Sequence, residues 1–354
     1  MRDPEHFNNV LGNARALPIT RPAGAEPVSH GGDLDAARKQ FPGAPEPWID
    51  LSTGINPVPF PIPALPAEVW SRLPMRAEEE ALLAAAATRY QVGNPDTIVP
   101  APGTQALIQL LPRLVPKSDV AILGPTYGEH EACWARQGHR VSVVEDLDRA
   151  NRADVVIVVN PDNPTGRVTS TGALRAIASA LAKKNGLLVV DEAFIDVLPD
   201  TASVAPDLPP ATIALRSFGK TYGLAGLRLG FAVAEVVLAS RLRAELGPWA
   251  VSGPGLRIGK AALDDAPWLA EATIRLESDR RRLDAMLEAA GLTVLGGTPL
   301  FRLVRHSEAM KIVERLGRNG IHVRIFPREP QWLRFGLPGD KQAWERLAAA
   351  LSAK

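Results

Sequence analysis

Short apolar runs alternate with helical patterns through the middle of the chain. The runs are three to five residues long and rich in β-branched side chains, which is typical of strands buried on both faces. They lie at residues 120–123, 141–144, 155–159, 187–190, 213–215 and 229–233, and helical patterns lie at 77–90, 105–114 and 171–184. This alternation predicts an α/β domain with a mostly parallel sheet over residues 75–250.

The C-terminal part of the chain has a different order of elements. A long helical pattern and a short apolar run come first, and a helix, two strands and a last helix follow. They are expected at 268–290, 292–295, 307–317, 322–326, 332–335 and from 341. These elements predict a second, smaller α+β domain. We expect an N-terminal arm at 1–27, a small domain made of 28–62 and 256–354, and a large domain at 63–255.

Charge and composition narrow the classes of partner. With 40 Lys and Arg against 39 Asp and Glu, the formal charge of +1 gives no reason to expect nucleic-acid binding. The chain has no apolar run as long as a membrane span, and its polar first residues do not predict a signal peptide. Cys133 is the single cysteine, which favours a reducing, cytoplasmic compartment, and the scattered histidines give no metal-binding spacing, so we expect no metal.

Proline and glycine are frequent, with 32 and 29 residues respectively. They make up about 17% of the chain, above the roughly 12% of average usage, and so predict many special turns. Several of them gather where the predicted strands end. Because ligands bind at the carboxyl ends of the strands in open α/β sheets, these turns are the candidate places for chemistry.

Polar side chains follow the predicted strands in a consistent way. One strand leads into NPDNPTG, which presents Asn163, and the next ends in Asp191. A third leads into RSFGK, which ends in Lys220, and Arg228 follows among glycines. An earlier strand end leads into Gly103 at the start of a helix, the outline of a phosphate cradle. Taken singly, these residues also fit a turn, a helix cap or a solvated charge.

Together these residues resemble a known family. Their order is a phosphate-binding helix start, the aromatic Tyr127, then Asn163, Asp191, Lys220 and Arg228, with spacings of 28, 29 and 8 residues between the last four. Over about residues 50–340 the chain resembles the fold-type I family of pyridoxal phosphate enzymes, the aspartate aminotransferase superfamily. The resemblance implies an α/β fold with a mostly parallel mixed sheet in the large domain, a smaller α+β domain, and pyridoxal 5'-phosphate as cofactor.

The resemblance also implies roles for single residues. Lys220 would attach the cofactor covalently, since an amine in a site rich in positive charge loses its proton readily. Asp191 would pair with the protonated pyridine nitrogen, Asn163 would hydrogen-bond the phenolic oxygen, and Tyr127 would stack on the ring. The residues implied at the cofactor phosphate are Gly103, Thr104, Gln105, Ser217 and Arg228.

Two positions depart from the family pattern. Many relatives carry Tyr where this chain has Phe194 in its DEAF segment, so the phenolic oxygen would have one donor fewer. Relatives also commonly carry a Tyr that reaches the cofactor phosphate of the neighbouring subunit, where this chain has Leu73. The second departure argues against that particular contact between subunits, although we still expect a homodimer.

Segments outside the ring contacts indicate which reaction the site serves. They are HGGD at 30–33, WIDLSTGINP at 48–57, DEAFID at 191–196, LRS at 215–217 and PWAVS at 248–252. Together they resemble the threonine-phosphate decarboxylase family of cobalamin biosynthesis. That resemblance implies decarboxylation of L-threonine O-3-phosphate, a small phosphorylated amino acid, to (R)-1-amino-2-propanol O-2-phosphate and CO2.

Two alternatives stay open at this point. Histidinol-phosphate aminotransferase is the nearest rival family, but it usually has an Asn-Glu-Asn-Pro segment and a DEAY motif, and the chain has neither. The other alternative is a catalytically silent partner in a corrinoid biosynthetic complex. The presence of Asn163, Asp191, Lys220 and Arg228 argues against it, because a silent protein has no use for a lysine that binds the cofactor.

The pose of the substrate would decide between decarboxylation and transamination. In this family the bond that breaks at Cα is the one held perpendicular to the cofactor ring, so contacts with the substrate phosphate and carboxylate set the reaction. The candidate substrate-binding residues are His30, Gly54, Ile55, Asn163, Arg324 and Arg334. Arg334 would hold the carboxylate by a bidentate fork. His30 could bind phosphate or only tie down the N-terminal segment, and Arg324 could face inward or be a surface charge. Lys220 would protonate Cα after CO2 leaves.

Overall fold

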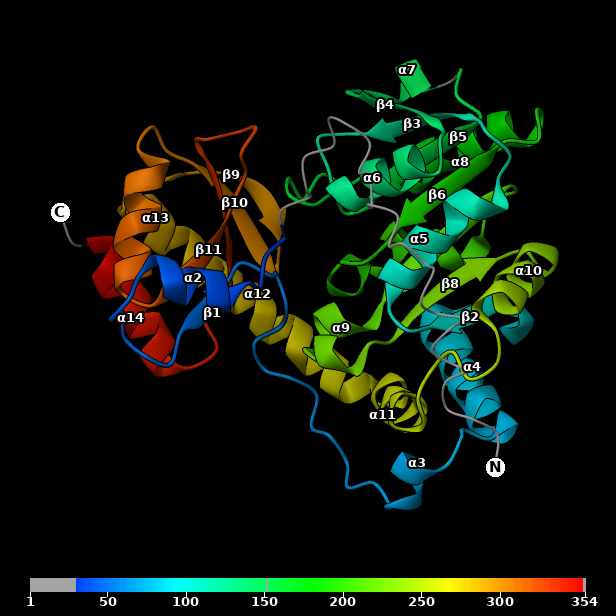
Figure 1. The fold of residues 1–354 in the computed structure, drawn as a ribbon, viewed down its shortest axis with the longest axis horizontal. Helices are drawn as coiled ribbons and strands as arrows, with labels where there is room; N and C mark the ends of the chain where they lie inside the picture. The colour runs from blue at the N-terminus through cyan, green and yellow to red at the C-terminus, as the bar shows by residue number, and fades with distance from the viewer. Residues whose placement is uncertain (1–29, 151, 353–354) are drawn as a thin grey trace, which may run out of the picture.

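The computed structural model describes residues 30–150 and 152–352, and it contains two β-sheets (Figure 1). The larger sheet has seven strands in the order β2-β8-β7-β6-β5-β3-β4. These strands are β2 (Ile98–Ala101), β3 (Asp119–Leu123), β4 (Arg140–Val144), β5 (Val155–Val159), β6 (Leu187–Asp191), β7 (Thr212–Ser217) and β8 (Gly230–Ala234). All pairs from β4 to β7 are parallel, whereas β8 pairs antiparallel with both β7 and β2. The sheet is therefore mixed but mostly parallel.

Helices cover both faces of the larger sheet. One face carries α5 (Thr104–Leu114), α6 (Gly128–Arg136) and α10 (Val236–Leu246), and the other carries α4 (Arg76–Tyr90), α8 (Thr171–Ala182) and α11 (Gly253–Asp264). The central strand β5 shows how the sequence produces this layering. Val155 and Ile157 belong to the first core and Val156 and Val158 to the second, because successive side chains of a strand point to opposite faces. A strand covered on both sides therefore reads as a continuous apolar run.

The smaller sheet has five strands in the order β1-β11-β12-β10-β9. They are β1 (Ile49–Leu51), β9 (Thr293–Thr298), β10 (Phe301–Arg305), β11 (Ile321–Ile325) and β12 (Trp332–Gly336). The N-terminal strand β1 pairs in parallel with β11, and the other pairs are antiparallel. Helices α2 (Leu34–Gln40), α12 (Ala266–Ala289), α13 (Ala309–Arg318) and α14 (Lys341–Ser352) lie on the same side of the molecule (Figure 1). A separate apolar core joins this sheet to α12, α13 and α14.

Short elements complete the fold. They are α3 (Glu68–Ser71), α7 (Leu147–Ala150), α9 (Phe218–Thr221) and five 3₁₀ turns at Pro95–Thr97, Ile195–Val197, Asp200–Ala202, Ala205–Asp207 and Ala225–Leu227. The chain between β1 and α3 is extended and leads away from both sheets in Figure 1, and α3 packs on α11, where Val69 is buried.

This topology confirms the predicted α/β class, with a mixed, mostly parallel sheet and a smaller α+β unit. The predicted strands and helices occur within a few residues of their expected limits. The domain limits stay a prediction, and the predicted arm at 1–27 lies outside the described residues. Within the described ranges, no helix combines the length and the apolar character needed to cross a membrane.

Candidate active site

The parallel strands β5, β6 and β7 end side by side, so the residues that follow them meet at one edge of the larger sheet. In the strand register Val159 pairs with Asp191, and Asp191 pairs with Leu215. Asn163 lies in the loop after β5, and Lys220 lies in α9, which begins directly after β7. The order of the strands therefore brings the predicted Asn163, Asp191 and Lys220 to the same edge.

Lys220 is partly buried, and its amine lies in an apolar and positively charged environment. Nζ is 5.6 Å from the centre of the Phe194 ring and 3.5 Å from the carbonyl oxygen of Thr53. Burial lowers the pKa of Lys220 to about 8, and the Arg334 guanidinium adds to that effect, while the Asp191 carboxylate opposes it. Half of the amine is then neutral at a pH near 8, and the neutral amine is the form that attacks an aldehyde.

Asp191 is buried and is held by a residue that the sequence pattern did not single out. Its Oδ2 lies 2.9 Å from Nε2 of His130, which is also buried, and its Oδ1 accepts a hydrogen bond from the backbone N–H of Ala193. His130 lies on α6, within the same GPTYGEH segment as Tyr127. The proximity of His130 to a predicted aromatic was the only signal in the sequence, because its contact with Asp191 depends on how α6 packs on the sheet.

Arg334 lies at the centre of a group of polar contacts on the smaller sheet. Its guanidinium donates hydrogen bonds to Asn163 Oδ1 and to the carbonyl oxygen of Ser52, and its Nε has no partner among the described residues. Burial lowers the pKa of Arg334 to about 9, and Arg324 adds to this shift, but the side chain stays cationic at neutral pH. Arg324 of β11 is the direct cross-strand neighbour of Arg334. Two cations placed in this way repel each other, so an anion bound between them would stabilise the pair.

The start of α5 forms the predicted cradle. No side chain in the described part of the chain caps this helix, so the N–H groups of Thr104 and Gln105 are available to an anion, whereas that of Ala106 donates to the carbonyl oxygen of Gly103. Gly103 has φ +83°, and a Cβ there would lie 2.8 Å from a guanidinium nitrogen of Arg228. A Cβ at Gly230 would lie 2.6 Å from the backbone nitrogen of Thr104. Two glycines therefore allow Arg228 and β8 to approach the helix start, next to Ser217 at the end of β7.

The remaining predicted residues line the same site. Tyr127 Oη donates a hydrogen bond of 3.2 Å to Gln105 Oε1, and the ring of Tyr127 lies 6.3 Å from that of His30. A Cβ at Gly54, which has φ +63°, would lie 3.1 Å from the Phe301 ring. Ile55 follows it, half-buried, in the stretch of chain that contacts Lys220 through the backbone. The structure thus brings the predicted cofactor-binding and substrate-binding residues into one region between the two sheets.

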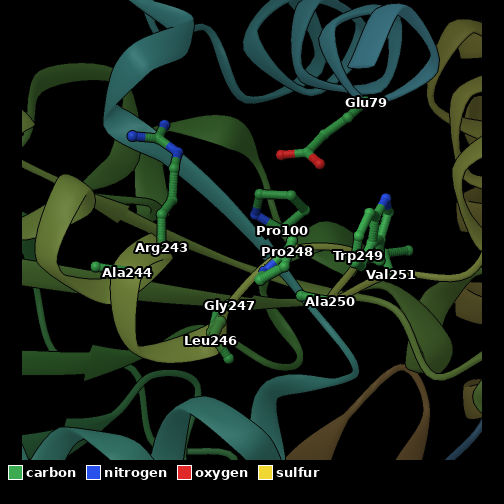
Figure 2. Close-up of a pocket in the computed structure, with 10 residues that line it drawn as sticks. All are labelled: Glu79, Pro100, Arg243, Ala244, Leu246, Gly247, Pro248, Trp249, Ala250 and Val251. Carbon is green, nitrogen blue, oxygen red and sulfur yellow. The ribbon is translucent and has the colours of Figure 1, made fainter. Parts of the chain in front are cut away.

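A second hollow lies at the β2 edge of the larger sheet. Figure 2 shows this pocket, which has a volume of about 410 Å³ and lies between α4, β2 and the segment that follows α10. Glu79 reaches into it from α4, and Pro100 and Trp249 line it. Because it contains none of the predicted catalytic residues, this pocket is distinct from the candidate active site.

Comparison with known proteins identifies the family. The family described as aminotransferase class I and II matches residues 71–351. The chain belongs to the class I and II aminotransferase family. This aminotransferase-family protein is 48% identical to a threonine-phosphate decarboxylase of Sinorhizobium sp, over 92% of this chain and 98% of that one. It is 40% identical to the threonine-phosphate decarboxylase of Pseudomonas aeruginosa, over 92% of this chain and 97% of that one. These matches confirm the resemblance predicted from the sequence.

Solved structures confirm the fold of this aminotransferase-family protein. A histidinol-phosphate aminotransferase from Sinorhizobium meliloti, solved in complex with pyridoxal-5'-phosphate, superimposes with a TM-score of 0.77 over 94% of this chain and 97% of that one. The two sequences are 24% identical, so this likeness shows the fold and does not identify the substrate.

The site fits pyridoxal phosphate, the cofactor of this family. When bound, pyridoxal phosphate acts as an electron sink for the electron pair left by a bond that breaks at the substrate Cα. Three features suit such a group. Lys220 has a lowered pKa, Asp191 is a buried carboxylate held in place by a histidine, and Gly103 opens a helix start that suits a phosphate.

Proposed function

We propose that this protein catalyses the pyridoxal phosphate-dependent decarboxylation of L-threonine O-3-phosphate. The products are (R)-1-amino-2-propanol O-2-phosphate and CO2, in the biosynthesis of cobalamin. The observation that carries this proposal is the match over nearly the whole chain to two threonine-phosphate decarboxylases. The arrangement of charges in the site supports it, because the substrate carries two anionic groups and the site offers more than one cation.

The proposal assigns the cofactor contacts to the residues at the edge of the larger sheet. Lys220 attaches the cofactor, Asp191 with His130 behind it faces the pyridine nitrogen, and Asn163 faces the phenolic oxygen. Tyr127 stacks on the ring. The proposed phosphate contacts are the first turn of α5 with Gly103, Thr104 and Gln105, together with Ser217 and Arg228. The uncapped helix start and the nearby arginine support this part of the proposal.

The proposal assigns the substrate contacts to the paired arginines and to the N-terminal segment. Arg334 binds the substrate carboxylate while its contact with Asn163 keeps the guanidinium oriented. Arg324, its cross-strand neighbour, and His30 bind the substrate phosphate. Gly54 and Ile55 pass close to Lys220 without bulk that would fill the site. Lys220 holds the proton that Cα takes up once CO2 has left, since its amine lies near the backbone of Thr53 and the ring of Phe194 in the same site.

The rival reaction is transamination of histidinol phosphate. The solved histidinol-phosphate aminotransferase supports that reading only through the fold. The experiment that separates the two is CO2 release from L-threonine O-3-phosphate by the purified holoenzyme. We expect turnover with this substrate and a loss of about a hundredfold or more in kcat/KM with unphosphorylated L-threonine, because cationic contacts made for a phosphate would then be left unpaired.

Two variants test the proposed contact between Arg324 and the substrate. Arg324→Gln should raise KM for threonine phosphate, whereas Arg328→Gln, at an exposed position just beyond β11, should leave KM unchanged. Glutamate formed from 2-oxoglutarate and histidinol phosphate, without CO2 release from threonine phosphate, would contradict the decarboxylase proposal. A holoenzyme that forms neither product would favour the catalytically silent partner.

We further propose that the protein works as a cytoplasmic homodimer. Large apolar side chains are exposed around the extended segment before α4 and near the second hollow, which a subunit interface would cover. They are Ile62, Trp70, Leu73, Met75 and Trp249. Cys133 is a buried free thiol, which is consistent with a reducing compartment.

A further inference from the structure

Glu129 is a buried carboxylate next to the candidate active site that the proposed mechanism does not use. It lies in the first turn of α6, and its two oxygens contact different parts of the chain. Oε1 lies 2.9 Å from Nε2 of His30, and Oε2 accepts a hydrogen bond from Nε2 of Gln105 at 2.7 Å. The Cys133 thiol lies 3.7 Å from Oε2. A carboxylate at a helix start is favourable in any case, so the partners decide whether Glu129 does more than that.

The contact with Gln105 fixes the direction of a hydrogen-bond chain. An ionised carboxylate only accepts hydrogen bonds, so Gln105 must turn its NH2 group toward Glu129. The carbonyl oxygen of the Gln105 side chain then points the other way and accepts the hydroxyl proton of Tyr127. Through Gln105, Glu129 thus orients the ring that is proposed to stack on the cofactor.

The contact with His30 reaches across the site. Residues 30–32, which we call the strap, are fixed at one end to the smaller sheet, where the backbone N–H of Gly32 donates to Ser52 Oγ at 2.7 Å. A Cβ at Gly31 would lie 2.4 Å from the carbonyl oxygen of Ser52, so only glycine allows this approach. That same carbonyl accepts the hydrogen bond from Arg334. At the other end His30 meets Glu129 on α6, which packs on the larger sheet.

We propose that Glu129 is a positioning residue that couples the strap to the cofactor ring. Its Oε2 aligns Tyr127 through Gln105, and its Oε1 holds His30 so that the strap closes over the substrate side of the site. The inference rests on the proposed function for the identity of the substrate, but both contacts of Glu129 exist whatever that substrate is. Loss of Glu129 therefore disturbs two regions that are far apart in the sequence.

The test compares holoenzymes that carry Glu129→Leu, Glu129→Gln or the control Glu131→Gln. Glu131 lies on the same helix, where its contact with Arg328 is exposed and 3.8 Å long. We measure hydrogen exchange at the Gly32 amide, the circular dichroism of the bound cofactor, and kcat and KM for threonine phosphate. The Glu129→Gln variant keeps the volume of the side chain. If Glu129→Leu fails to fold, Glu129→Gln therefore tests whether Glu129 positions the strap and the ring.

Both Glu129 variants should speed exchange at Gly32 and change the circular dichroism of the cofactor. KM should rise about tenfold, the scale of one lost charged hydrogen bond, while kcat falls less, because an open strap weakens binding of the ground state and the transition state alike. The variant His30→Ala should speed exchange but leave the cofactor signal unchanged, since it releases only the strap. If Glu129 had a merely structural role, its substitution would lower the unfolding temperature. Exchange at Gly32, the cofactor signal and KM would then not change in the way described.

The result that would overturn the inference is a folded Glu129→Gln holoenzyme with the exchange rate and the cofactor signal of Glu131→Gln. Exchange and circular dichroism need no substrate, so they also separate this inference from the proposed function. A wild-type enzyme that releases no CO2 from threonine phosphate would contradict the decarboxylase proposal. Hydrogen exchange at Gly32 and the circular dichroism of the cofactor would still test the roles of the two Glu129 contacts.

Discussion

Lys220 experiences opposing electrostatic effects that set the pH at which it can react. Burial and the guanidinium of Arg334 disfavour the ammonium form, whereas Asp191 and Asp50 favour it. The balance lowers the pKa to about 8, from an ordinary value above 10. A lysine with its ordinary pKa would be almost fully protonated at neutral pH, so the surroundings of Lys220 raise the share of reactive amine by more than a hundredfold.

The first prediction concerns the attachment of pyridoxal phosphate to the apoprotein. Its rate should rise with pH, with a midpoint near 8, and then level off, because only the neutral amine reacts. Arg334→Gln removes a positive charge that lowers the pKa, so its midpoint should move to higher pH, and Asp50→Asn should move the midpoint to lower pH. Absorbance of the attached cofactor, followed after mixing at each pH, measures the rate. Midpoints that shift in the same direction in both variants would contradict this account.

The second prediction concerns His130, the buried partner of Asp191. His130→Leu leaves Asp191 Oδ2 without its neighbour in a buried site, so the Kd for pyridoxal phosphate should rise about tenfold. His139→Leu is the matched control, since His139 is also buried but bonds to the carbonyl of Pro112 instead. Cofactor titration of both variants should show weaker binding only in the first. Equal affinities in the two variants would show that Asp191 does not depend on His130.

At the scale of elements, the apolar pattern predicted the strands that are buried on both faces. The run 155–159 coincides with β5. A strand covered by helices on both sides is apolar along its whole length, so its ends can be read from the ends of the apolar run. The pattern missed β1, which has only three residues and pairs with β11 far along the chain. It also missed α11, which begins with Gly-Pro-Gly and is stabilised by the Ser252 cap and by packing on α4. Such elements depend on tertiary contacts that local patterns do not contain.

In the candidate site, too, some residues could be predicted from the local sequence, whereas others depend on tertiary contacts. Lys220, Asp191 and Asn163 could be placed from the sequence because each follows a strand, and parallel strands end at the same edge. His130 and Glu129 lie inside a helix, where the sequence does not show which face meets the site. Their roles follow from the packing of α6 against the sheet, which supplies the partners Asp191 and Gln105.

The third prediction concerns the ion pairs that join β7 to the segment after β6. Buried Arg216 contacts Glu192 at 3.1 Å and also pairs with Asp196. Arg216→Ala would leave buried Glu192 without its cation, whereas Asp196 would keep Arg89 at 3.3 Å, so it should lower the free energy of unfolding by about 3–5 kcal/mol. The control Arg140→Ala breaks an exposed pair with Asp119, and we expect it to leave the free energy of unfolding almost unchanged.

Urea unfolding of the Arg216 and Arg140 variants, followed by far-ultraviolet circular dichroism, measures both effects. Arg216 directly precedes Ser217 at the end of β7, and Glu192 directly follows Asp191. We therefore expect Arg216→Ala to weaken cofactor binding as well as stability. Similar unfolding midpoints for the two variants would show that the buried pairs contribute little.

At the scale of the whole molecule, the exposed apolar surface around α3 is the feature that a single chain leaves unexplained. Trp70 and Leu73 are more than 60% exposed on a segment that extends away from both sheets (Figure 1). Burying side chains of this size stabilises an association by about 1.5–3 kcal/mol each. A second copy of the chain that covers them would explain why such residues lie at a surface. In a dimer with a two-fold axis, the same segment of both subunits would lie in the interface.

The last prediction follows from that surface. Trp70→Glu combined with Leu73→Glu should convert a dimer into a monomer, because each substitution places a charge in an interface that must exclude water. The control is Met310→Glu, which changes an exposed apolar residue on α13, a helix that lies well away from α3 in Figure 1. Size-exclusion chromatography with light scattering should give twice the 37.9 kDa of one chain for the wild type and the control, and a single chain for the double variant. A wild type that is already monomeric would contradict the proposed dimer, and a double variant that stays dimeric would place the interface on another face.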